Sequence, residues 1–168
     1  ELALGFLFSE GLIRRRDDLH ERGVRVRFIG RRGGRVPGRL RRQIADAEEL
    51  TRRNRRMTLT FAFNYGGRAE LVDAARAIGH EVEAGRLDPD KINDRTLARH
   101  LYAPDMPDPD LLVRTSGEFR ISNYLLWELA YAELVFTDVL WPDFRRDHLF
   151  EAIREFQRRE RRFGAVDG

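Results

Sequence analysis

Apolar and polar positions along the chain repeat with two different periods. Strands are predicted where apolar residues alternate with polar ones or form short apolar runs, over 24–30, 57–64, 111–114 and 134–136. Helices are predicted where apolar residues recur three or four positions apart, over 1–22, 38–54, 68–84, 93–101, 121–131 and 147–162. Strands that alternate with helices predict an α/β fold with an open, mainly parallel sheet of about four strands, flanked by helices.

The carboxyl ends of the expected strands are the natural place for a ligand. Right-handed crossovers bring the ends of parallel strands to one edge of the sheet, where open α/β sheets bind their ligands. Asn64, Arg114 and Thr137 fall at three such ends. The chain opens inside the first expected helix, so the sheet either begins with a helix or lacks an N-terminal part.

Composition is typical of a folded domain and argues against one class of function, nucleic-acid binding. The chain has 168 residues, a hydrophobic fraction of 42% and a formal net charge of +3, which suit a single domain with a core. Lys91 is the only lysine, so nearly all cationic side chains are arginines. Arginine favours bidentate phosphate contacts, but a coding sequence that prefers arginine codons is the plainer explanation of this bias. Acidic residues interspersed among the basic ones argue against a nucleic-acid-binding domain.

Targeting and redox signals are few. The absence of cysteine excludes disulfides and thiolate metal sites and permits a reducing compartment. No apolar run reaches the roughly 18 residues that cross a bilayer. A cytoplasmic location is therefore expected.

The segment 108–144 carries the strongest chemical signal. An apolar strand runs into Arg114, and a polar turn, Arg120 and Ser122 follow it. Two guanidinium groups, a hydroxyl and the backbone N–H groups of residues 115–117, with the N-terminus of the next helix, suit a phosphate group. Glu133 adds an oxygen ligand of the kind Mg²⁺ prefers. The alternatives are surface ion pairs for the arginines and a cap or an ion pair for Glu133.

Five motifs in the chain resemble those of the cis-prenyltransferases, the undecaprenyl diphosphate synthase-like enzymes. They are Asn-Tyr-Gly-Gly-Arg over 64–68, Asp-Leu-Leu-Val-Arg-Thr-Ser-Gly-Glu-Phe-Arg-Ile-Ser-Asn over 110–123, Ala-Tyr-Ala-Glu-Leu over 130–134, Leu-Trp-Pro-Asp-Phe over 140–144 and Arg-Arg-Phe-Gly over 161–164. Their order and spacing match the family over nearly the whole chain, so the resemblance implies an undecaprenyl diphosphate synthase-like fold.

The resemblance also implies an activity and a set of site residues. Such enzymes condense isopentenyl diphosphate with an allylic prenyl diphosphate to give a cis-polyprenyl diphosphate, and Mg²⁺ assists departure of the allylic diphosphate. The expected substrate-binding residues are Arg114, Arg120, Ser122, Glu118, Asn64, Arg162 and Gly164. Glu133 matches the metal-linked acid, and Arg162 and Gly164 match an element that reaches across the interface of a homodimer. Asn64 also has a plainer explanation as turn chemistry.

The family's opening motif, Met-Asp-Gly-Asn-Gly-Arg-Trp-Ala with the catalytic aspartate, has no counterpart in this sequence. We therefore expect a single domain over 1–168 that lacks the family's N-terminal strands, holds no catalytic residue and turns over poorly or not at all by itself. A non-catalytic partner subunit is the leading alternative. Peripheral membrane contact for product release is compatible with the resemblance. Candidates for an apolar channel wall are Leu4, Phe6, Leu7, Phe8, Met57, Leu59, Phe61 and Phe63.

Overall fold

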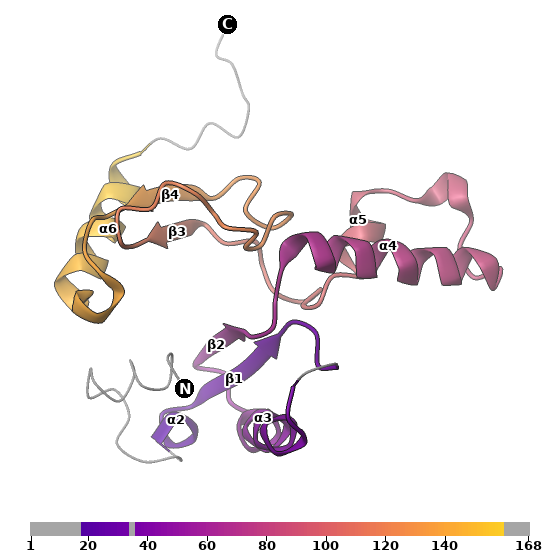
Figure 1. Ribbon diagram of the computed structural model, residues 1–168, viewed down its shortest axis with the longest axis horizontal. Coiled ribbons are helices and arrows are strands. Elements are labelled where there is room, and N and C mark those ends of the chain that lie inside the picture. The colour runs from indigo at the N-terminus through magenta and orange to yellow at the C-terminus, as the bar shows by residue number, and fades with distance from the viewer. Residues whose placement is uncertain (1–17, 34–35, 160–168) are drawn as a thin grey trace, which may run out of the picture. The chain divides into compact units, whose positions relative to one another are not determined.

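The computed structural model describes residues 18–33 and 36–159. The chain divides into two compact units, Glu1–Pro104 and Asp105–Gly168 (Figure 1). The two units are parts of one chain, and the single domain over 1–168 stays a prediction.

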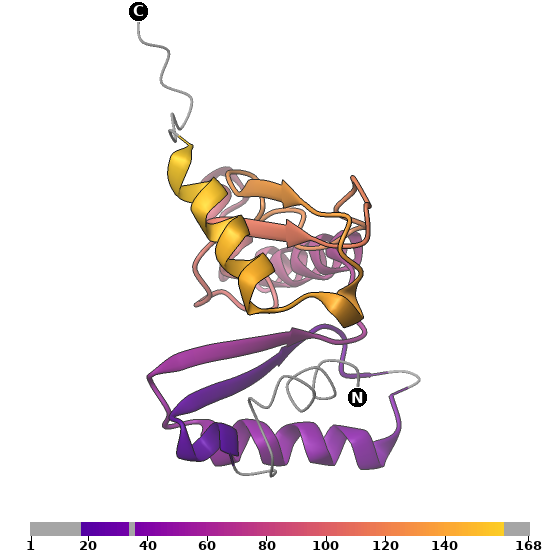
Figure 2. The same cartoon turned by 90° about the vertical axis from the view of Figure 1, so that its left-hand side faces the viewer.

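Unit 1 is built on two parallel strands, β1 (Val24–Ile29) and β2 (Met57–Ala62), whose register pairs the first and last residues of each. Its helices are α2 (Asp18–Glu21), α3 (Gly38–Thr51), α4 (Gly67–Glu83) and α5 (Asp94–Ala98), with a 3₁₀ turn at Pro89–Lys91. Helix α3 lies along β1, as Figures 1 and 2 show from two sides.

Side chains from α3 and its exit close the outer edge of β1. The Val26 N–H donates to Thr51 Oγ1 (2.9 Å), and the Phe28 N–H donates to Glu48 Oε1 (2.9 Å). The Asn54 amide donates to the Val24 carbonyl at 2.8 Å. Because these backbone groups are satisfied by side chains, β1 is an edge strand protected against further pairing.

Unit 2 repeats the parallel pairing on a smaller scale. Strands β3 (Leu111–Arg114) and β4 (Glu133–Phe136) pair in register, a 3₁₀ turn covers Trp141–Asp143, and α6 (Arg146–Arg158) packs on β4 (Figure 2). Its buried apolar residues are Leu125, Leu129, Val135, Phe144 and Ala152.

The four expected strands are confirmed, and so is their parallel direction within each pair. Within the described residues each unit contains one two-stranded parallel pair, and a single sheet of about four strands stays a prediction.

The expected helix over 121–131 is wrong, because this stretch folds as a series of turns. Ser122, Asn123 and Leu125 have positive φ angles of 48°, 63° and 43°, which an α-helix does not accept. The apolar spacing that suggested a helix instead buries Leu125 and Leu129 in the core of unit 2. Within the described residues, no helix is both long and apolar enough to cross a membrane.

Candidate functional site

Arg114 is the last residue of β3 and lies at the carboxyl edge of the β3–β4 pair. The Thr137 N–H, just beyond β4, donates to the Arg114 carbonyl at 2.9 Å, so the two strand ends meet as the sequence predicts. The Arg114 Nε atom is buried and has no hydrogen-bond partner. A buried guanidinium N–H without an acceptor is costly, and an anion bound at this edge would satisfy it.

The turn after Arg114 is held by its own backbone. Ser116 and Gly117 both have left-handed φ angles, 70° and 64°, and their N–H groups donate to the carbonyls of Val139 (2.9 Å) and Thr137 (3.0 Å). A Cβ on Gly117 would lie 3.1 Å from Asp138 Oδ1, so both the φ angle and this tight contact favour glycine at the position. The expectation that these N–H groups cradle a phosphate is therefore wrong for both residues, since they fix the turn instead.

Arg120, Glu118 and Ser122 line the outer part of the same loop. Arg120 forms an ion pair with Glu118, and the Arg120 side chain remains 69% exposed. Ser122 is exposed. Between the paired residues, the Phe119 ring packs on Phe136, with 5.2 Å between ring centroids. The structure thus brings Glu118 and Arg120 together and ties their loop to the end of β4.

Glu133, the expected metal ligand, begins β4 and is already paired. Its Oε2 atom accepts a hydrogen bond from Arg159 Nη1 at 2.8 Å, and its N–H donates to the Asp110 carbonyl at 2.9 Å. Hydrogen bonds to Glu133 and then Glu155 raise the pKa of Arg159 above its ordinary value. Residues 18–33 and 36–159 contain no group of three or more potential metal-ligating side chains. The described residues therefore do not form a magnesium centre.

Asn64 lies in unit 1, just after β2, and its contacts are those of a turn. The Asn64 amide donates to the Arg31 carbonyl at 2.7 Å, and the Arg31 N–H donates back to the Asn64 carbonyl at 3.2 Å. A Cβ on Gly30 would lie 2.2 Å from the Phe63 carbonyl oxygen, so only glycine allows this approach. These contacts join the ends of β1 and β2, and a role of Asn64 in substrate binding stays a prediction.

A polar network around two acidic residues of α4 was not predicted from the sequence. Glu70 is 2% exposed and accepts hydrogen bonds from the Tyr65 hydroxyl and from the Tyr102 N–H (2.9 Å). One turn later, Asp73 accepts from the Tyr102 hydroxyl (2.6 Å) and, through both oxygens, from Arg31 (2.8 Å each). These bonds, from Arg31 first and then Tyr102, lower the pKa of Asp73 to about 2. The only local signal was two acids three positions apart on one helix face.

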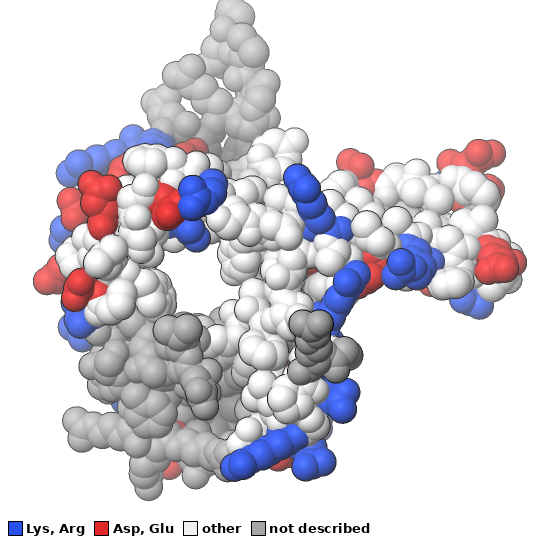
Figure 3. All heavy atoms as spheres, in the orientation of Figure 1, with Lys and Arg blue, Asp and Glu red and all other residues white. Residues whose placement is uncertain are grey.

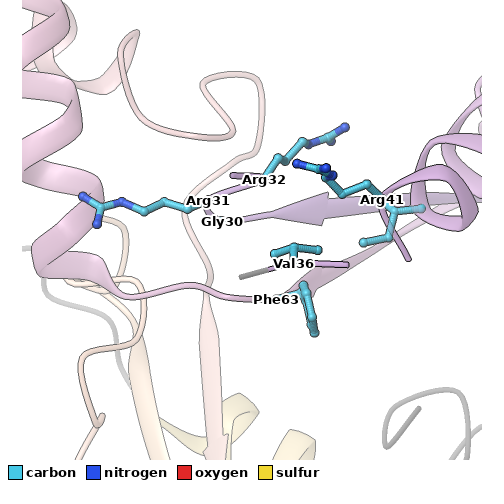
Figure 4. A pocket seen from close by; sticks show the side chains of 7 residues that line it. Gly30, Arg31, Arg32, Val36, Arg41 and Phe63 are labelled. Carbon is cyan, nitrogen blue, oxygen red and sulfur yellow. The ribbon is translucent and has the colours of Figure 1, made fainter. Parts of the chain in front are cut away.

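A small hollow lies at the carboxyl ends of β1 and β2 in unit 1 (Figure 4). Its lining includes Gly30, Phe63 and three arginines, 31, 32 and 41. The Arg31 guanidinium points away from the hollow, toward Asp73 on α4, and Arg32 pairs with Glu48 at 2.8 Å. With two of its three arginines ion-paired, this hollow is a weaker anion site than the buried edge at Arg114.

Comparison with known proteins decides the family. A family model described as "Putative undecaprenyl diphosphate synthase" matches residues 3–164. The chain belongs to this family of cis-prenyltransferases.

Curated cis-prenyltransferases are similar to the chain at high identity. Trans,polycis-polyprenyl diphosphate synthase ((2Z,6E)-farnesyl diphosphate specific) of Thermobifida fusca is 54% identical over 165 residues, covering 95% of this chain and 57% of that protein. Decaprenyl diphosphate synthase of Mycobacterium bovis is 50% identical over 153 residues, covering 91% of this chain and 51% of that protein. The chain thus spans little more than half the length of these two relatives.

Solved structures agree with the assignment to the cis-prenyltransferases. Lavandulyl diphosphate synthase from Lavandula x intermedia, solved in complex with dimethylallyl diphosphate, has a TM-score of 0.82 and 38% identity, covering 96% of this chain and 67% of that one. A probable undecaprenyl diphosphate synthase from Campylobacter jejuni has a TM-score of 0.74 and 33% identity, covering 87% and 65% of the two chains. The undecaprenyl diphosphate synthase-like α/β fold is confirmed.

Some expected cis-prenyltransferase site residues fall outside the described part of the chain. Arg162 and Gly164 do, as do the channel candidates before residue 17. The other channel candidates lie on β2 or just after it: Met57 and Phe63 are 52% and 42% exposed, and Phe61 stacks on Phe28 with centroids 5.1 Å apart. The apolar side chains of Met57 and Phe63 are thus left partly exposed by the described residues.

Proposed function

We propose that this protein is a cis-prenyltransferase that condenses isopentenyl diphosphate with an allylic prenyl diphosphate to give a cis-polyprenyl diphosphate. The observation that carries the proposal is the buried Arg114 Nε without an acceptor, at the carboxyl end of a parallel strand and next to the Arg120 loop. The names of the curated relatives support the same reaction class.

Arg114, Arg120 and Ser122 would bind the diphosphate of isopentenyl diphosphate. A guanidinium is the strongest side-chain partner for a diphosphate because its N–H groups match two oxygens at once. Arg114 offers its unsatisfied Nε–H, and Arg120 exchanges part of its contact with Glu118 for the ligand. Glu118 keeps Arg120 near this loop while the site is empty, which limits the side-chain entropy lost on binding.

The reaction forms a carbon–carbon bond between the two prenyl units. The allylic substrate loses its diphosphate, and the isopentenyl unit loses a proton as the new double bond forms. The residues placed here hold one substrate and orient it, and we assign no catalytic residue to this chain. Residues that orient a bound substrate and exclude water from it lower the barrier of the reaction.

Magnesium is expected from the family resemblance, but the described residues do not fit it. Mg²⁺ needs several oxygen ligands in octahedral geometry, and here one carboxylate, Glu133, is already paired with Arg159. A magnesium ion in the reaction would have to take its ligands from the substrate diphosphates and from residues outside the described ranges.

The same proposal includes a homodimer with Arg162 and Gly164 in contact across its interface. It also includes a cytoplasmic location and a peripheral membrane contact for product release. The family resemblance supports the dimer, and sedimentation velocity of the protein tests it directly. Nucleic-acid binding is not part of the proposal, because cationic and anionic side chains are interspersed on the face seen in Figure 3.

Titration calorimetry with isopentenyl diphosphate tests the assignment of Arg114. We expect Arg114→Gln to weaken binding about tenfold or more, since a hydrogen bond to a charged group contributes about 1.5–3 kcal/mol. Arg154→Gln, on the exposed side of α6, removes the same charge and should leave binding within about twofold. Equal binding by wild type and Arg114→Gln would overturn the assignment. A wild-type chain that binds no isopentenyl diphosphate would favour the partner-subunit alternative.

A further inference from the structure

Glu133 and Arg159 connect the start of β4 to the end of α6 in unit 2. Arg159 Nη1 donates both to Glu133 Oε2 (2.8 Å) and to the Leu134 carbonyl (3.0 Å). The two ionic side chains are largely shielded, with 34% of Arg159 and 26% of Glu133 exposed. A single nitrogen shared between a carboxylate and a backbone carbonyl of the same strand fixes the guanidinium against β4.

The other side of Arg159 is fixed to its own helix. Its Nη2 atom is paired with Glu155, one helical turn earlier, and its N–H donates to the Phe156 carbonyl at 3.1 Å. Arg159 is the C-cap of α6, where a cation is favoured by the helix dipole. A carboxylate four residues before an arginine is also the favourable order on a helix. Arg159 is therefore the point at which the last turn of α6 is attached to the strand.

This arrangement conflicts with Glu133 as a magnesium ligand. A divalent cation at Glu133 would lie beside a guanidinium that already compensates the carboxylate, and the two cations would repel each other. Within the described residues, Glu133 belongs to no group of three or more side chains that could hold a metal ion. The carboxylate is thus built into a structural ion pair.

We propose that Glu133 anchors the C-terminal end of α6 instead of binding magnesium, and that Arg159 is the positioning residue for the last turn of this helix. This anchor does not depend on the proposed function.

The first test measures the energetic coupling between the Glu133 and Arg159 side chains, by urea unfolding of the chain followed by tryptophan fluorescence. Both tryptophans, Trp127 and Trp141, belong to unit 2, so the signal reports on the unit that contains the ion pair. We expect Glu133→Gln and Arg159→Gln each to raise the unfolding equilibrium constant about three- to fivefold, and the double variant to do no more than Arg159→Gln alone. Additive effects would overturn the anchor.

The positioning role of Arg159 is tested by amide hydrogen exchange in the last turn of α6. Exchange should be faster in Arg159→Gln and partly restored in Arg159→Lys, which keeps the charge with fewer donors. Arg158→Gln is the matched control, because Arg158 is an exposed neighbour in the same turn. The positioning role is wrong if Arg158→Gln accelerates exchange as much as Arg159→Gln, or if neither does.

Thermal unfolding with and without millimolar Mg²⁺ tests the metal directly. A ligand that binds only the folded state raises its melting temperature, so a magnesium site at Glu133 would give a shift that Glu133→Gln abolishes. We expect equal responses of wild type and Glu133→Gln, and a shift confined to wild type would refute the proposal. None of these three measurements uses isopentenyl diphosphate, so they decide the anchor even where the proposed function fails.

Discussion

Glu70 offers the sharpest test of what holds unit 1 together. Its carboxylate is buried and accepts hydrogen bonds from the Tyr65 hydroxyl and the Tyr102 backbone N–H. Glu70→Ala deletes both acceptors and leaves the Tyr102 N–H without its partner, which costs about 1–3 kcal/mol for the buried donor and about 1 kcal/mol for the hydroxyl bond. We therefore expect a loss of about 2–4 kcal/mol in the free energy of unfolding.

Glu70→Gln and Tyr65→Phe separate the two contacts. The amide keeps the shape and one acceptor oxygen but turns an NH₂ group toward the other donor, so we expect a loss of about 1–2 kcal/mol. Tyr65→Phe removes one hydrogen bond, and its effect should not add to that of Glu70→Gln, because the two residues share the bond.

Urea unfolding followed by far-UV circular dichroism measures these losses, since α3 and α4 are the two longest helices described and both belong to unit 1. Glu83→Ala is the matched control on the same helix: its side chain is 83% exposed, and we expect a change within about 0.5 kcal/mol. A loss below about 1 kcal/mol for Glu70→Ala, or an equal loss for Glu83→Ala, would refute the reasoning.

Two further predictions concern a pH dependence and a turn. Hydrogen bonds from Arg31 and then Tyr102 lower the pKa of Asp73 from 3.8 to about 2, so the folded state favours the carboxylate. The stability that Asp73 contributes is therefore complete above about pH 4 and is lost as the pH falls through 2. Acid titration of stability should therefore be steeper for wild type than for Asp73→Asn, and parallel curves would contradict this cause. Gly117→Ala should lower the free energy of unfolding by about 1–2 kcal/mol, because φ is +64° and the new Cβ would crowd Asp138 Oδ1. Urea unfolding followed by tryptophan fluorescence measures this loss, and an unchanged midpoint would exclude the strain.

Local pattern determined the elements and the family. Alternation over 24–30 and the apolar run over 111–114 predicted β1 and β3, and parallel pairing placed Arg114 and Thr137 at one edge. These features depend on residues close together in the chain, where side-chain period and backbone propensity act directly. The family motifs are likewise contiguous stretches of sequence.

The same local reasoning failed where a partner was distant or a backbone angle unusual. The apolar spacing over 121–131 looked helical, yet positive φ angles at Ser122, Asn123 and Leu125 turn the chain. The donors of Ser116 and Gly117 were expected to meet a ligand, but they meet carbonyls beyond β4. In the second case the acceptors, the carbonyls of Val139 and Thr137, belong to a segment that no local window contains.

Only the tertiary structure decided which charges are paired. Glu133 and Arg159 lie 26 residues apart, Glu70 and Tyr102 lie 32 apart, and Arg31 and Asp73 lie 42 apart. An arginine or a carboxylate looks the same in a sequence whether it binds a ligand or a neighbour, because the choice depends on which groups packing brings within hydrogen-bond distance. The sequence determined that unit 2 carries an arginine-rich strand end, and folding determined that Arg114 Nε is left without a partner while Glu133 is not.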